Sequence, residues 1–173
     1  MLLQASLGSA PGTRVAIYTA EPGPMPVAGE AVSQRIVQML KGKGIEYFPK
    51  HTVIGLAEPR TLKFQSDAHG DFDFLVYVPK HRVPEVLVRS GLAAEGGWVP
   101  VDRHTLETKF ADVYAIGDST GIPLKNGKSL PKAGVFAHGQ AEVVARNIAA
   151  KLAGGSPVER FNGDGSCFVE MGR

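Results

Sequence analysis

Short apolar runs, separated by glycine, proline and charged residues, divide the first fifty residues into strand-like and helix-like segments. Residues 13–20 (TRVAIYTA) hold a β-rich run between turn residues, which predicts a strand. In residues 30–41 apolar side chains recur at helical spacing, which predicts an amphipathic helix that ends at Gly42 and Gly44. Residues 45–48 predict a second strand, so the three segments form a βαβ unit with parallel strands.

The middle of the chain alternates between hairpin-like and continuously apolar patterns. Residues 51–60 and 61–65 predict a pair of strands joined at Glu58–Pro59, and residues 66–71 predict a turn. Residues 72–79 (FDFLVYVP) are almost wholly apolar, as expected of a central strand buried on both faces. The connection that follows predicts one helical turn around residues 85–89 and a short extended piece at residues 98–102.

The pattern from residue 112 to residue 153 organises the rest of the chain. Residues 113–116 predict a buried strand, which ends in a corner formed by Gly117 and Asp118. Asp118 would then lie at the carboxyl end of a parallel strand, where open α/β sheets bind ligands. After a polar loop, Pro131 predicts the start of one long helix, whose stripe of small residues would pack on a sheet. The stripe comprises Ala137, Ala141, Val144, Ala145, Ile148, Ala149 and Leu152.

A helix that opens at Pro131 would leave the first N–H groups behind it without partners. Those of Lys132, Ala133 and Gly134 would form a partly positive pocket suited to an anionic group. A carboxylate beside such a pocket suits a ligand that carries both hydroxyls and developing negative charge.

Composition and charge narrow the class of protein. Of 173 residues, 43% are hydrophobic and 21% are charged, which fits a globular chain with a core rather than a disordered one. The net charge of +2 gives no support for nucleic-acid binding, and no apolar stretch reaches the roughly 20 residues that span a bilayer. A single cysteine allows no intrachain disulfide, so a reducing cytoplasm is the expected compartment. The five histidines are scattered, and no metal site is expected.

Two segments at a fixed distance carry a resemblance to a known family. The segment VYAIGDST (113–120), followed by LPKAGVFAHGQAEVVARNI (130–148), resembles the second FAD-binding motif of the two-dinucleotide-fold flavoproteins, the FAD-dependent pyridine nucleotide-disulfide oxidoreductases. Within them it is most similar to the group of sulfide:quinone reductase and flavocytochrome c sulfide dehydrogenase. The resemblance implies FAD as the cofactor. It assigns the ribityl chain to Asp118 and the pyrimidine edge of the flavin to the helix start, and thus cofactor-binding roles to Gly117, Asp118, Lys132, Ala133 and Gly134.

The resemblance also implies a domain order and two catalytic residues. Residues 1–89 resemble the later part of a NAD(P)-binding Rossmann domain, residues 90–153 the C-terminal segment of an FAD-binding domain, and residues 154–173 the start of a truncated C-terminal domain. Lys132 would stabilise negative charge on the reduced flavin. Cys167 matches one of the two redox cysteines that handle sulfide in the family.

No G-x-G-x-x-G occurs in the sequence, although this motif is the usual anchor of the adenosine half of FAD. The expected fold is therefore α/β, a partial Rossmann-like, FAD/NAD(P)-binding three-layer architecture with a parallel sheet and without the N-terminal G-x-G-x-x-G half. Two functions stay open. The chain is part of an FAD-dependent oxidoreductase that moves electrons from a sulfur donor to flavin and on to an acceptor. Alternatively, it is a flavin-free Rossmann-like remnant that binds a separate N-terminal portion or forms a homodimer, because open sheet edges must be covered.

Overall fold

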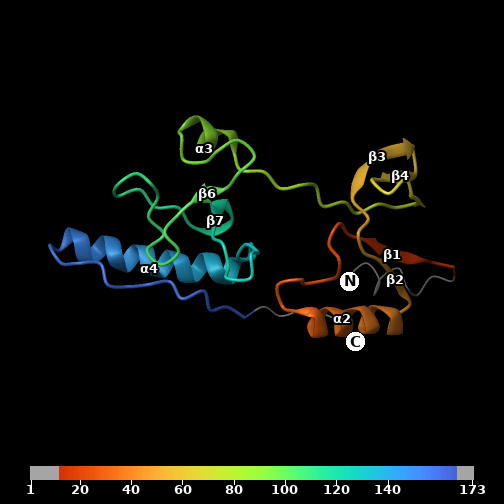
Figure 1. Ribbon diagram of the computed structural model, residues 1–173, viewed down its shortest axis with the longest axis horizontal. Coiled ribbons are helices and arrows are strands. Elements are labelled where there is room, and N and C mark those ends of the chain that lie inside the picture. The colour runs from red at the N-terminus through yellow and green to blue at the C-terminus, as the bar shows by residue number, and fades with distance from the viewer. Residues whose placement is uncertain (1–11, 167–173) are drawn as a thin grey trace. The chain divides into compact units, whose positions relative to one another are not determined.

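The computed structural model describes residues 12–166, which divide into two compact units at Val78–Pro79. The first unit holds the elements from β1 (Val15–Tyr18) to β5 (His69–Asp71), and the second holds those from α3 (Glu85–Arg89) to α4 (Gly134–Leu152) (Figure 1). Both units mix helices with strands, and two of the three small sheets are parallel pairs. The expected α/β class with parallel strands is therefore confirmed.

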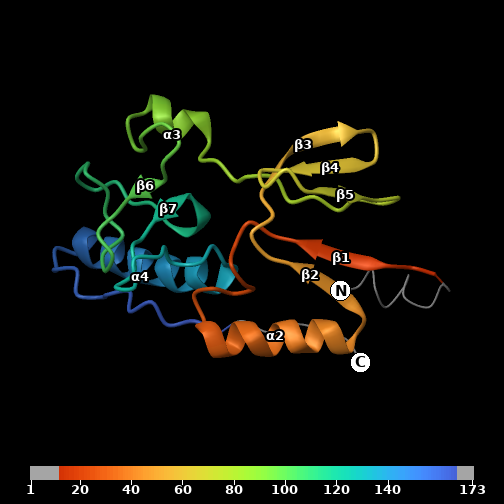
Figure 2. The ribbon, with the colours of Figure 1, turned by 45° about the vertical axis from the view of Figure 1, so that its right-hand side comes forward.

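The first unit begins with the βαβ element that the apolar pattern predicts. Strand β1 (Val15–Tyr18) pairs in parallel with β2 (Ile45–Phe48), and α2 (Glu30–Gly42) connects them. The helix buries Leu40 and packs beside β2, as Figure 2 shows. Its last residue is Gly42, and Gly44 follows with a φ of 69°, a backbone conformation that glycine adopts without strain.

A three-stranded antiparallel sheet follows the βαβ element in the first unit. Strands β3 (Val53–Glu58) and β4 (Thr61–Phe64) form the expected hairpin, and β5 (His69–Asp71) adds a third strand where a turn alone was expected. Phe64 is fully buried and stacks on Tyr18 of β1, with the ring centroids 4.8 Å apart. This aromatic contact joins the two sheets of the unit.

The buried central strand expected at residues 72–79 does not form. Residues 72–79 have no strand structure, and the large apolar side chains at positions 74–78 are between 37% and 72% exposed. At the start of this run the N–H of Phe72 donates a hydrogen bond to Arg60 O, but this contact does not continue as a strand. An apolar run becomes a buried strand only when other strands supply its hydrogen-bond partners, and none of the described residues pairs with this one.

The second unit is built around α4 (Gly134–Leu152) and a short parallel pair. Strand β6 (Val99–Pro100) pairs with β7 (Thr120–Gly121), and α3 (Glu85–Arg89) forms the helical turn that the sequence predicts. Residues 154–166 run back alongside α4 in both ribbon views (Figures 1 and 2). The core of this unit consists of Leu106, Ile122, Val143, Val144 and Phe161.

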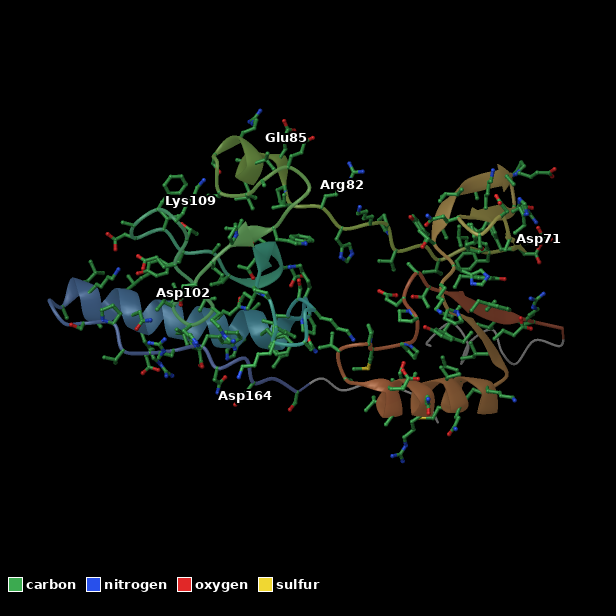
Figure 3. All side chains as sticks on the ribbon, in the orientation of Figure 1. Asp71, Arg82, Glu85, Asp102, Lys109 and Asp164 are labelled. Atoms are coloured by element: carbon green, nitrogen blue, oxygen red, sulfur yellow. The ribbon has the colours of Figure 1, made fainter. Side chains whose placement is uncertain are left out.

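Two side chains fix the loop after β6 and the returning chain. Asp102, labelled in Figure 3, accepts hydrogen bonds through Oδ1 from the N–H groups of His104 and Thr105, each at 2.8 Å. Asn147 of α4 donates through Nδ2 to Glu159 O and accepts from Glu159 N, each at 3.0 Å. Asn147 thus satisfies both backbone groups of Glu159, which ties the returning chain to the helix.

The strand expected at residues 113–116 is also absent. Only an isolated bridge between Glu107 and Tyr114 forms there, and Val113 and Ile116 are 38% and 37% exposed. The physical reason is the same as for residues 72–79: within the described residues no neighbouring strand pairs with this run along its length. The Gly-Asp corner that follows is nevertheless formed, because it depends on local backbone conformation rather than on a sheet.

The long helix begins three residues later than expected, and its buried face overlaps the expected stripe only in part. Helix α4 starts at Gly134 rather than at Pro131, because Ala133 has an extended backbone (φ −152°, ψ 145°). Its buried residues are Gln140, Val143, Val144 and Asn147, whereas Leu152 of the expected small-residue stripe is 85% exposed. The helix packs on loops and on the returning chain rather than on a wide sheet. Buried amide side chains are favoured there because they satisfy loop backbone groups.

Candidate functional site

The Gly-Asp turn is held in place by hydrogen bonds from both sides. Gly117 has a φ of 68°, in the left-handed region, and begins the 3₁₀ turn η1 (Gly117–Ser119). Its N–H donates to Oε1 of Gln140 on α4 at 2.6 Å, and its carbonyl accepts from Thr120 Oγ1 at 2.8 Å. The side chain of Asp118 is exposed beyond this anchored backbone. The turn therefore presents a carboxylate on a fixed support.

The N-terminus of α4 faces the same region without a side-chain cap. Ala133 occupies the N-cap position, and its carbonyl accepts from the N–H groups of Phe136 and Ala137. Alanine has no side-chain acceptor for the first N–H groups of the helix, so this end keeps the partial positive charge of a helix N-terminus. The first N–H groups of α4 begin at Gly134, so Lys132 and Ala133, which the sequence pattern also included, precede the helix.

Lys132 lies in the extended segment that leads into α4, and its side chain is half-buried. Its ammonium donates a hydrogen bond to Thr120 O and lies 4.0 Å from the ring centroid of Trp98. Burial lowers the pKa of Lys132, and the nearby carboxylate of Asp118 opposes this shift. The turn and the helix start thus bring a carboxylate and a partly desolvated cation close together.

These groups line one small hollow in the second unit. Gly117, Asp118, Lys132 and Ala133 are among its lining residues, and its enclosed volume is about 10 Å³, which holds a single water molecule. Gly134 does not line it, and Cys167 lies outside the described residues. The structure therefore brings together four of the six residues singled out from the sequence. Whether they bind a cofactor stays a prediction.

Three residues of the site were not singled out from the sequence. Gln140 is 1% exposed and holds the Gly117 N–H, while Thr120 and Trp98 hold the Lys132 ammonium. One signal for Gln140 was present: it follows Ala133 and Ala137 at helical spacing, on the face that meets the turn. A polar residue beside an apolar stripe does not by itself indicate a buried position, because polar side chains usually lie on the solvent face of a helix. Nothing local indicates that Trp98 meets Lys132, which lies 34 positions away.

The βαβ unit, the short parallel pair and the Gly-Asp turn beside a helix start define a Rossmann-like α/β protein. The sequence model of the pyridine nucleotide-disulphide oxidoreductase family matches residues 3–141. Since this match covers most of the chain, the chain belongs to that family. The resemblance that the motifs around Asp118 and Lys132 carry is thereby confirmed.

Curated relatives and solved structures agree with this assignment. The chain is 38% identical over 102 residues to the mitochondrial sulfide:quinone oxidoreductase of Schizosaccharomyces pombe. This match covers 58% of this chain and 21% of the relative. It is 30% identical over 139 residues to the type II NADH:quinone oxidoreductase of Haemophilus influenzae. That match covers 79% of this chain and 31% of the relative. The chain thus spans between a fifth and a third of the length of these relatives.

Among solved structures, the sulfide:quinone oxidoreductase from the hyperthermophilic bacterium Aquifex aeolicus has the same fold over the shared region. The TM-score is 0.66 at 22% sequence identity, and the match covers 81% of this chain and 36% of that chain. The likeness supports the Rossmann-like fold. In the part of the chain that the structure describes, no helix is both long and apolar enough to cross a membrane.

The residues present fit one part of an FAD molecule. A carboxylate, an ammonium and an uncapped helix N-terminus around one hollow suit hydroxyl groups and a negatively charged ring edge. A hollow that holds one water molecule can contact the edge of a flavin ring but cannot enclose the ring. The sequence also lacks G-x-G-x-x-G, so the fit extends to the ribityl and ring-edge contacts and not to the adenosine half.

Proposed function

We propose that this chain contributes the ribityl and ring-edge contacts of the flavin site of an FAD-dependent oxidoreductase related to sulfide:quinone oxidoreductases. The observation that carries the proposal is the convergence of Asp118 and Lys132 at one hollow beside the uncapped start of α4. FAD would supply the redox chemistry, taking electrons from a reduced sulfur donor and passing them to an acceptor. Two relatives with quinone oxidoreductase in their names make a quinone the proposed acceptor class.

Each residue of the hollow has a distinct task in this proposal. The Asp118 carboxylate accepts hydrogen bonds from ligand hydroxyls, and Gln140 fixes the backbone that carries it. The Lys132 ammonium and the N–H groups at the start of α4 stabilise negative charge at the edge of the ring. Cys167 is proposed as a thiol that handles sulfur, which requires a second cysteine from outside this sequence. Lys132 and Cys167 are the catalytic candidates.

FAD binding by the full chain tests the proposal directly. Purified protein is titrated with FAD, and binding is followed by the change in flavin fluorescence. Asp118→Ala should weaken binding by about 1–3 kcal/mol, the loss typical of a charged hydrogen-bond partner. Glu95→Ala removes an exposed carboxylate of the same unit and serves as the matched control, which should bind FAD as the unmodified chain does. Absence of FAD binding, or equal binding by both variants, contradicts the proposal.

A second candidate function is supported by the exposed apolar run at residues 74–78. Five consecutive large apolar side chains without strand partners are the kind of surface that pairs with another chain. We propose that a portion of the family fold that carries G-x-G-x-x-G, or a second copy, covers this run. Such a partner would also supply the contacts to the adenosine half that this sequence lacks.

Light scattering coupled to size exclusion tests the second candidate. Association should weaken in Val76→Lys, because a charge within a buried strand contact is costly. Leu152→Lys is the control, since Leu152 is an apolar residue outside the run and is even more exposed than Val76. A strictly monomeric full chain that also fails to bind a co-expressed G-x-G-x-x-G portion would contradict this function.

A further inference from the structure

The single tryptophan of the sequence lies beside the candidate flavin site. Trp98 directly precedes β6, and the parallel register pairs Val99 with Thr120 and Pro100 with Gly121. A Cβ at Gly121 would lie 3.1 Å from the Cβ of Trp98, which is tighter than about nine in ten Cβ contacts in proteins. The short β6–β7 pair therefore holds the backbone of Trp98 closely against the strand that follows the Gly-Asp turn.

Lys132 contacts Trp98, which directly precedes β6, and Thr120, which belongs to β7. The face of the Trp98 indole lies 4.0 Å from its ammonium, and the carbonyl of Thr120 accepts its hydrogen bond. An indole is the strongest cation–π partner among the side chains, and a partly desolvated ammonium gains more from it than an exposed one. Burial lowers the pKa of Lys132, which agrees with a cation removed from water on one side.

We propose that Trp98 is a positioning residue, whose indole face, together with the Thr120 carbonyl, holds the Lys132 ammonium at the rim of the hollow and presents it to a negatively charged ring edge. The part that concerns a ligand rests on the proposed flavin function. A free lysine side chain loses rotamer freedom when it binds a ligand, and a lysine that is already ordered loses less. A residue that only supported the fold would not act on ligand affinity through Lys132.

The first arm of the test needs no cofactor. In a chain labelled on lysine carbons, the ε-methylene protons of Lys132, assigned with Lys132→Met, should be shifted upfield by the indole ring current. The shift should disappear in Trp98→Leu and persist, reduced, in Trp98→Phe, which keeps an aromatic face. An unshifted Lys132 signal in the unmodified chain would show that the contact does not exist in solution and would overturn the proposal.

The second arm measures FAD affinity in a double-mutant cycle. Trp98→Leu should weaken FAD binding about 2- to 30-fold, the range of a cation–π contact, and Trp98→Phe should recover part of the loss. In the Lys132→Met background the same Trp98→Leu change should have no further effect. The control is Phe110→Leu, which removes a second cation–π contact, to Lys109 at 5.2 Å, outside the hollow and should leave FAD affinity unchanged.

The outcomes separate this proposal from the proposed function. Equal losses with and without Lys132 would show that Trp98 acts through the fold alone, which overturns the positioning role. If the unmodified chain binds no FAD, the proposed function fails, and the ring-current shift alone then decides whether Trp98 holds Lys132. Should Trp98→Leu fail to fold, Trp98→Phe carries both arms, with a smaller shift and a smaller loss expected.

Discussion

Replacement of Gln140 by methionine tests how the Gly-Asp turn is held. Gln140 is 1% exposed, and its Oε1 accepts the Gly117 N–H at 2.6 Å. Methionine has nearly the same length and shape but no strong acceptor, so the change removes the hydrogen bond with little change in packing. The N–H of Gly117 then lacks its side-chain partner in a half-buried position, a loss of about 1–3 kcal/mol in the free energy of unfolding.

Urea denaturation, followed by the fluorescence of Trp98, measures this loss in the unit that contains Gln140. Trp98 is the single tryptophan and belongs to the same compact unit as Gln140, so the signal reports that unit. The midpoint should fall for Gln140→Met while the slope of the transition stays the same, because the surface exposed on unfolding hardly changes.

Ala149→Gln, at an exposed position of the same helix, is the control and should stay within about 0.5 kcal/mol of the unmodified chain. If Gln140→Met is as stable as this control, the side-chain hydrogen bond does not hold the turn. Gln140 would then not position the backbone that carries Asp118.

Three further predictions concern the same unit. Asn147→Ala should lower the free energy of unfolding by about 1–3 kcal/mol, because it removes two hydrogen bonds from the Asn147 side chain to the backbone of the returning chain; urea denaturation measures this loss against the unmodified chain. Gly117→Ala should cost about 1–2 kcal/mol, because its φ of 68° is unfavourable for alanine, and calorimetry should show a lower Tm. Hydrogen bonds from the N–H groups of Thr105 and His104 lower the pKa of Asp102. The ionised Asp102 carboxylate therefore contributes to stability above its unfolded pKa of about 3.9, and this contribution is lost as the pH falls through its lower folded pKa. In a pH series of denaturation curves, the loss of stability on the acid side should be smaller in Asp102→Asn.

Each of these expectations has a contradicting outcome. An Asn147→Ala chain as stable as the unmodified chain would mean that the two hydrogen bonds are replaced by water. An unchanged Tm for Gly117→Ala would mean that the turn relaxes out of the left-handed region. If stability falls equally at low pH in the unmodified chain and in Asp102→Asn, other groups cause the acid sensitivity.

Local sequence patterns were sufficient to predict secondary structure where a segment is stabilised by its own residues and its immediate neighbours. The helix at residues 30–41, the strands on either side of it and the hairpin after them follow from spacing and turn residues, and all are confirmed. The two expected buried strands, residues 72–79 and 113–116, are wrong for the described structure. An apolar run indicates a segment that could form a buried strand, but the hydrogen-bond partners of such a strand come from other parts of a fold. None of the described residues provides these partners.

The site shows the same division between local and tertiary information. By itself, the sequence determined that a Gly-Asp turn is followed by a long helix, because glycine permits the left-handed turn and the residues after Pro131 favour a helix. The start of that helix at Gly134 is set by the extended backbone of Ala133 in the structure. Only the tertiary structure decided that Gln140 holds the turn and that Trp98 holds Lys132. These contacts join residues 23 and 34 positions apart, so they depend on how the segments pack, which no short stretch of sequence encodes.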